Sequence, residues 1–98
     1  MTLNEMKELF EIHNDSFLKF EEINEKNHKH PRRDICAFLI IDGLQQKSNS
    51  SIISGAQHDK IWIDGDLEKI AELIDNDTVI DLIRCGIFID EGSFAMFG

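Results

Sequence analysis

The fold of this chain is decided by the stretch His58-Asp59-Lys60-Ile61-Trp62-Ile63-Asp64-Gly65-Asp66. Isoleucines at positions 61 and 63 alternate with polar or aromatic residues, and this period of two predicts a strand over 60–64 with two unlike faces. Asp66 follows as a good N-cap for a helix over 67–74, whose apolar residues fall on one side. A strand that leads directly into an amphipathic helix favours an α+β fold.

A long amphipathic helix is predicted at the start of the chain. Thr2 and Glu5 have the spacing of a capping box. Apolar residues and one histidine then recur at steps of three and four residues: Leu3, Met6, Phe10, His13, Phe17 and Phe20. This spacing predicts a helix over 3–25. The stripe serves either packing within the chain or self-association.

Self-association through this stripe is our expectation, because a small chain gains buried area by dimerising. The candidate residues for a homodimer interface are Met6, Phe10, His13 and Phe17. Charging His13 inside an apolar seam costs desolvation, so acidification should weaken such a dimer. If a Glu or Asp of the facing helix reached His13, it would favour the charged imidazole, and acidification should then strengthen the dimer.

The middle of the chain contains its only basic segment, residues 27–33, which ends the first helix. The segment is either a solvated connector or a contact for a phosphate or an acidic surface. Pro31 fits the first turn of a second helix over 31–46. A buried strand over 35–41 is the alternative. Residues 47–51 are predicted to be a polar loop.

The last part of the chain predicts the rest of a small sheet. A strand begins within 51–54, a short helix over 79–83 follows caps at 75–77, and strands at 87–89 and 93–97 flank a tight turn. The expected fold is a long N-terminal helix and three further helices, packed on a mainly antiparallel sheet of three to four strands. The predicted core consists of Phe10, Phe17, Phe38, Leu39, Ile70, Leu82, Ile83, Phe88 and Phe94.

The last strand carries apolar residues on both of its faces. Phe94 and Met96 alternate with Ala95 and Phe97. Either helices cover both faces of the sheet or one face is an interface, since a monomer rarely exposes a large apolar patch. With four helices predicted, cover on both faces is the simpler expectation.

Length and charge bound the class of protein. The 98 residues make a single domain, 1–98, since chains divide only beyond roughly 250–300 residues. The net charge is −9, from 19 acids and 10 bases. Nucleic-acid binding normally needs a dominant basic stripe, so we expect none directly. An acidic chain suits a basic protein partner.

Three features favour a cytoplasmic location. The first residues are acidic and lack the basic and apolar regions of a signal peptide. The longest apolar run, 35–41, is too short to span a bilayer. Cys36 and Cys85 have neither metal nor redox spacing, and we expect two buried thiols. We predict no membrane contact and no cofactor.

Residues that could carry chemistry gather around the strand at 60–64. A metal-dependent enzyme or metal-regulated module using His58, Asp59, Asp64 and Asp66 is one hypothesis, because such ligands suit Mg²⁺ or Mn²⁺. No hydrolase motif or glycine-rich phosphate loop is present, and we predict no catalysis. The leading interpretation makes this region a partner-binding rim, with candidate residues Trp62, Asp59, Asp64, Asp66, Glu68 and Glu72.

Three stretches carry a resemblance: His-Pro-Arg-Arg-Asp-Ile-Cys-Ala-Phe-Leu at 30–39, His-Asp-Lys-Ile-Trp at 58–62 and Asp-Leu-Ile-Arg-Cys-Gly at 81–86. They resemble small uncharacterised proteins of phages and other mobile elements, over residues 30–97. The resemblance brings no catalytic motif and implies an accessory factor that modulates a host protein in the host cytoplasm. Because residues 51–98 hold ten acids and three bases, mimicry of nucleic-acid phosphates to block a nucleic-acid-binding or defence protein is a sharper variant.

Overall fold

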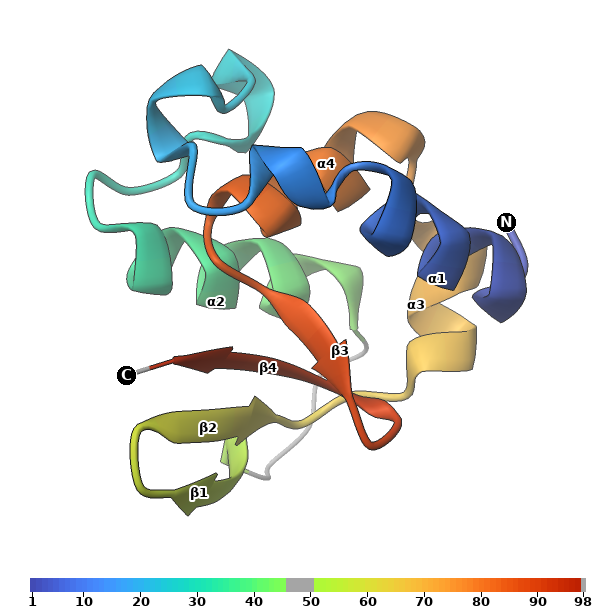
Figure 1. Cartoon of the computed structure of the whole chain (residues 1–98), viewed down its shortest axis with the longest axis vertical. Helices are drawn as coiled ribbons and strands as arrows, with labels where there is room; N and C mark the ends of the chain where they lie inside the picture. Colours follow the sequence, from blue (N-terminus) through green and yellow to red (C-terminus); the bar gives the residue numbers. More distant parts are fainter. Residues whose placement is uncertain (46–50, 98) are drawn as a thin grey trace.

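The computed structural model describes residues 1–45 and 51–97 and has the expected α+β architecture (Figure 1). Its helices and strands are α1 (Leu3–Ile12), α2 (Arg33–Leu44), β1 (Ile53–Gln57), β2 (Lys60–Ile63), α3 (Leu67–Leu73), α4 (Asn76–Arg84), β3 (Phe88–Asp90) and β4 (Ser93–Phe97). Three short 3-10 turns, at Asn14–Ser16, Phe20–Glu22 and Glu25–Asn27, join α1 to the segment before α2. The polar loop predicted over 47–51 lies outside the described residues, except for Ser51.

The strands form one four-stranded antiparallel sheet in the order β1-β2-β4-β3. β4 is therefore a central strand that pairs with β2 on one side and β3 on the other. The predicted hairpin of the last two strands is confirmed. The middle segment forms the helix α2, as predicted, and not the alternative strand over 35–41. Within the described residues no helix is long and apolar enough to cross a membrane.

Local signals set the starts of three helices as expected. The Thr2 hydroxyl accepts a hydrogen bond from the Glu5 amide at 3.2 Å, and the Glu5 carboxylate accepts one from the Thr2 amide at 2.8 Å. Asp66 caps α3 by accepting from the amides of residues 68 and 69. Asp75 caps α4 by accepting from the Thr78 amide at 2.7 Å. These caps depend only on neighbours in sequence, which explains why the sequence predicts them.

The prediction of a helix over 3–25 is wrong, because α1 ends at Ile12. The next residues, Asn14, Asp15 and Ser16, have short polar side chains that compete with helical backbone hydrogen bonds and favour turns. Leu18 then takes a left-handed backbone conformation, with φ of 64°, which no α-helix accommodates. The 3-10 turns on either side of Leu18, Asn14–Ser16 and Phe20–Glu22, both contact α4.

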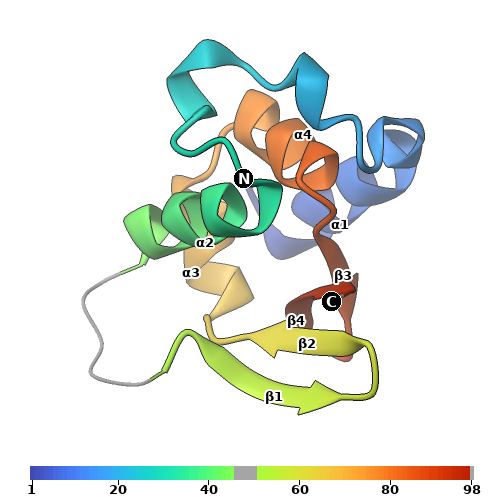
Figure 2. The ribbon, with the colours of Figure 1, turned by 90° about the vertical axis from the view of Figure 1, so that its left-hand side faces the viewer.

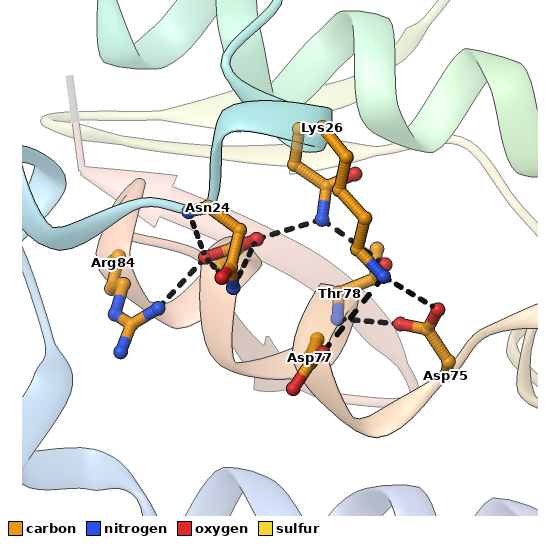
Figure 3. Close-up of polar contacts among 8 residues, drawn as sticks. Asn24, Lys26, Asp75, Asp77, Thr78 and Arg84 are labelled. Carbon is orange, nitrogen blue, oxygen red and sulfur yellow. Dashed lines mark hydrogen bonds and ion pairs between the residues drawn. The ribbon is translucent and has the colours of Figure 1, made fainter.

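A buried carboxylate holds this irregular segment in place. Asp81 of α4 is fully buried and accepts hydrogen bonds from the Asn24 backbone and side-chain amides and from the Asn27 side chain, the last at 2.7 Å. Arg84 donates to the same carboxylate at 2.9 Å, and Figure 3 shows Asn24 and Arg84 with dashed lines to this shared acceptor. Burial of a charge is tolerated only when it is paired and hydrogen-bonded, and Asp81 meets both conditions.

The core lies between the helices and one side of the sheet. Its large, fully buried side chains come from all four helices and two strands, and include Met6, Ile41, Ile63, Ile70, Leu82 and Phe94. The core prediction is wrong for two residues. Leu39 is 42% exposed, and Phe88 lies outside the cluster of buried apolar residues that forms the core. Both cysteines are buried free thiols, as predicted.

Helices cover only one side of the sheet, so the expectation of cover on both faces is wrong. In both views of the ribbon, all four helices lie on the same side of the strands (Figures 1 and 2). The other side of the sheet faces away from the helices. Its side chains therefore decide what the sheet presents to the surroundings.

Candidate functional site

The register of the strands identifies the side chains on the uncovered side of the sheet. Residues directly opposite one another in antiparallel strands point to the same side. Ala95 lies opposite both Trp62 and Phe88, and Lys60 lies opposite Phe97. We call this surface the open face. Asp90 belongs to it because it lies two residues beyond Phe88 on the same strand. The open face therefore consists of Lys60, Trp62, Phe88, Asp90, Ala95 and Phe97.

A polar contact crosses the open face from one neighbour of β4 to the other. The Asp90 carboxylate of β3 accepts a hydrogen bond from the Trp62 indole N–H at 3.0 Å and pairs with the Lys60 ammonium at 2.9 Å. The Lys60 ammonium also lies 5.0 Å from the centre of the Trp62 ring, within range of a cation–π attraction. The Asp90 carboxylate and the Lys60 ammonium hold the indole in one position on the sheet.

Small residues make room for the indole. Ala95 lies between the strands that carry Trp62 and Asp90, and it is fully buried. On the β1 side Trp62 faces Gly55, where an added Cβ would lie 3.5 Å from the indole. A large side chain at position 95 would stand between the indole and the Asp90 carboxylate. We therefore expect a large side chain at position 95 to disturb the contact between Trp62 and Asp90.

The aromatic part of the open face continues to the edge of the sheet. The rings of Phe88 and Phe97 lie 4.9 Å apart, and Phe17, from the segment after α1, lies 6.4 Å from Phe88. Phe97 is 52% exposed, the largest exposure of any aromatic side chain described. Trp62, Phe88 and Phe97 belong neither to the cluster of buried core residues nor to the side chains that pack against it, among the residues that the structure describes. Phe88 and Phe97 are thus in ring contact on the open face, and Phe17 links them to the core, against which it packs.

The electrostatics of the open face favour an ionised Asp90. The Lys60 ammonium, and after it the Trp62 indole N–H, lower the pKa of the Asp90 carboxyl below its ordinary value. An aspartate is ionised at neutral pH even with its ordinary pKa, and the lowered pKa extends this charged state to more acidic solution. Such a mixture of aromatic area and oriented polar groups is typical of protein interfaces.

The predicted partner-binding residues are divided between two parts of the molecule. Trp62 lies on the open face, whereas Asp59 lies in the exposed turn between β1 and β2. Asp66, Glu68 and Glu72 lie on or before α3, on the other side of the sheet from the indole.

Asp64, the remaining predicted residue, follows β2. Its amide donates to the Ile52 carbonyl at 2.7 Å, and its carbonyl accepts from the Gln45 side chain at 2.9 Å. The backbone of Asp64 therefore anchors the chain between β2 and α3.

The residues of the metal hypothesis show no common site. Among residues 1–45 and 51–97, no three His, Cys, Asp or Glu side chains form a group that could hold a metal ion. His58 lies in the β1–β2 turn with φ of 55°, and Asp66 is occupied as the cap of α3.

The predicted self-association stripe is used largely inside the chain. Met6 is fully buried, and the ring of Phe10 packs 5.8 Å from that of Phe94 in the core. Phe17 packs on Phe88. His13 is the C-cap residue of α1, which ends the helix there. Self-association itself stays a prediction, but Met6 has no surface to offer it.

Sequence reasoning missed Asp90 and Phe97 as site residues. The alternation of Ala95 and Phe97 with Phe94 and Met96 does signal two apolar faces. Which of those faces is open follows only from the placement of the helices. Comparison of the chain with protein-family models, with curated proteins and with solved structures gives no match in any of the three.

Proposed function

We propose that the chain is a small protein-binding accessory factor that acts without catalysis and docks a partner protein on its open face. The observation that carries the proposal is the set of three aromatic side chains on the open face, Trp62, Phe88 and Phe97, which lie outside the core. Aromatic residues are enriched in the centres of protein interfaces, where they give most of the binding energy. The proposed contact therefore centres on Phe97 and Trp62.

Charge supports a basic partner surface. The chain carries a net charge of −9, and a field of one sign raises the rate at which an oppositely charged protein associates. The resemblance of residues 30–97 to small phage proteins extends the proposal to a host protein as the partner. In its sharper form, that partner is a protein that itself binds nucleic acid.

The proposal is tested by capture from bacterial lysate with the parent and with Phe97→Asp. We expect a stoichiometric partner with the parent and at least a tenfold loss with Phe97→Asp, because a buried charge replaces an aromatic contact. Leu73→Asp is the matched control: Leu73 is 66% exposed but lies on α3, away from the open face. It should capture the partner as the parent does.

The identity of the contact is checked with the purified partner. A basic partner should bind more weakly as the salt concentration rises from about 0.05 to about 0.5 M. Displacement by oligonucleotides would support the phosphate-mimic form. Equal capture by the parent and Phe97→Asp would show that the open face is not the docking surface.

A further inference from the structure

The edge of the sheet at β3 carries backbone groups that no strand of the described residues pairs with. Glu91 and Gly92 both have positive φ, 51° and 77°, which defines a two-residue hairpin turn of type I′. In such a hairpin the residues that flank the turn, Asp90 and Ser93, form a hydrogen-bonded pair. The next pair, Ile89 and Phe94, is then not hydrogen-bonded. The N–H and C=O of Ile89 therefore point away from β4, toward the free edge.

A groove lies along this edge, between β3 and α1. It has a volume of about 500 Å³ and is lined by Phe10, Phe17, Ile83, Phe88 and Ile89, with Lys7, Glu11 and Asn14 of the α1 side. This volume falls within the roughly 300–1,000 Å³ of sites that hold a ligand. Because Phe88 belongs to both, the groove is continuous with the open face.

Two charged side chains line the groove, and they are the base Lys7 and the acid Glu11 of α1. The chain as a whole is acidic, with a net charge of −9. An occupant with positive side chains complements this charge.

We infer that the groove binds an extended basic segment of a partner polypeptide, which adds to the sheet as a strand beside β3. Addition of a strand to a free edge satisfies outward backbone groups with main-chain hydrogen bonds and places alternate side chains in neighbouring pockets. Here Ile89 supplies the donor and acceptor, the aromatic floor receives apolar side chains, and Glu11 faces a lysine or arginine. The inference rests on the proposed function and names the part of the partner that binds.

The probe is the blocked heptapeptide Lys-Val-Lys-Val-Lys-Val-Lys, titrated into isotope-labelled protein and followed by amide NMR signals. We expect saturable shifts confined to residues 7–14 and 87–90. At a peptide concentration about ten times the measured Kd, exchange of the Ile89 N–H should slow about tenfold. Absence of these effects at Ile89 overturns the inference.

Two comparisons test the strand geometry and the charge. The peptide Lys-Pro-Lys-Pro-Lys-Pro-Lys has the same charge but cannot pair as a strand, so it should leave Ile89 unchanged. Glu11→Lys should weaken the valine peptide at least threefold, whereas Glu21→Lys, an exposed charge on a 3-10 turn, should change its Kd by less than twofold. Equal binding of both peptides, or equal effects of both variants, overturns the inference.

Two further outcomes distinguish peptide binding in the groove from docking on the open face and from self-association. Phe97 does not line the groove, so Phe97→Asp should bind the peptide as the parent does. Partner capture that survives Phe97→Asp then contradicts the open-face proposal, while the peptide results still decide the groove. If sedimentation shows that the protein alone dimerises and so protects Ile89, a second copy occupies the edge and the inference is overturned.

Discussion

The two sides of the sheet are built from the same strands but have different partners. On the covered side, Ile63, Phe94 and Met96 are buried against the helices. On the open face, Trp62 and Phe97 keep exposed area and are fixed by contacts within the sheet. Burial links the first set to stability, whereas we expect replacement of the exposed Phe97 to cost little stability. The comparison teaches that apolar content on both faces of a strand does not imply that both faces are core.

The largest expected effect contrasts two phenylalanines of β4. Phe94→Ala removes a fully buried ring and should lower the free energy of unfolding by about 3–5 kcal/mol. Phe97→Ala removes a ring that is 52% exposed and should cost under about 1 kcal/mol. Urea denaturation of both variants measures the difference. Similar losses would mean that the open face is as important for stability as the core.

The second contrast concerns two paired carboxylates, one on each side of the sheet. Asp81→Ala leaves Arg84 and the amides of Asn24 and Asn27 without their acceptor, and we expect a loss of about 3 kcal/mol. Asp90→Ala on the open face should lower stability less, because water can replace its contacts. Thermal unfolding compares the two. An equal shift in Tm would contradict the assignment of Asp81 as the buried anchor.

The third contrast uses two glycines with positive φ that flank β3. At Gly86, φ is 96° and an added Cβ would lie 2.8 Å from the Leu18 side chain. Gly86→Ala should therefore cost about 1–3 kcal/mol, from backbone strain and the clash together. At Gly92, φ is 77° but no atom of the described residues lies within 4 Å of an added Cβ, so Gly92→Ala should cost only the strain. Equal losses in urea denaturation would show that the half-exposed Leu18 side chain moves aside, so that only the backbone strain remains.

The smallest expected effect is the acid sensitivity of the cap of α4. Hydrogen bonds from Thr78, and then the Lys26 ammonium, lower the pKa of Asp75 from 3.8 to about 2. A lowered pKa adds stability that is complete above about pH 4 and is lost as the pH falls from about 4 to about 2. Because the side chain is 60% exposed, solvent screening should limit the loss to under about 1 kcal/mol.

A matched variant isolates this contribution. Asp75→Asn keeps a side-chain oxygen that can cap the helix but cannot titrate. The unfolding free energies of the parent and Asp75→Asn should converge between about pH 4 and about pH 2, and should differ by a constant amount above this range. A gap that stays constant throughout the acid range would contradict the lowered pKa of Asp75.

The sequence predicts those parts of the fold that depend on neighbouring residues. The caps at Thr2, Asp66 and Asp75 and the alternation in β2 are such local features, and all are confirmed. The end of α1 has a local cause in the polar residues 14–16, but the path of the segment that follows has not, because Asn24 and Asn27 hold it on Asp81, more than 50 residues further along the chain. A regular spacing of apolar residues could not reveal that long-range contact.

For a similar reason, only part of the candidate site could be predicted from the sequence. Trp62 stands out by residue type, and its place in an alternating strand is a local property. Its partner Asp90 lies on a strand that is separated from β2 by β4, so the pair exists only through the order of the strands. The acids of α3 share a short stretch of sequence with Trp62, yet they lie on the other side of the sheet.

The central position of β4 has a consequence for the order of folding. β4 follows all the other elements in the chain, but it is the strand that joins the β1–β2 hairpin to β3. Until residues 93–97 are available, the hairpin and β3 have no hydrogen-bonded connection, and each keeps an unpaired edge. Formation of the sheet must therefore wait for contacts between segments about 30 residues apart, which are slow to close. During synthesis, such an intermediate is the kind of species that chaperones bind.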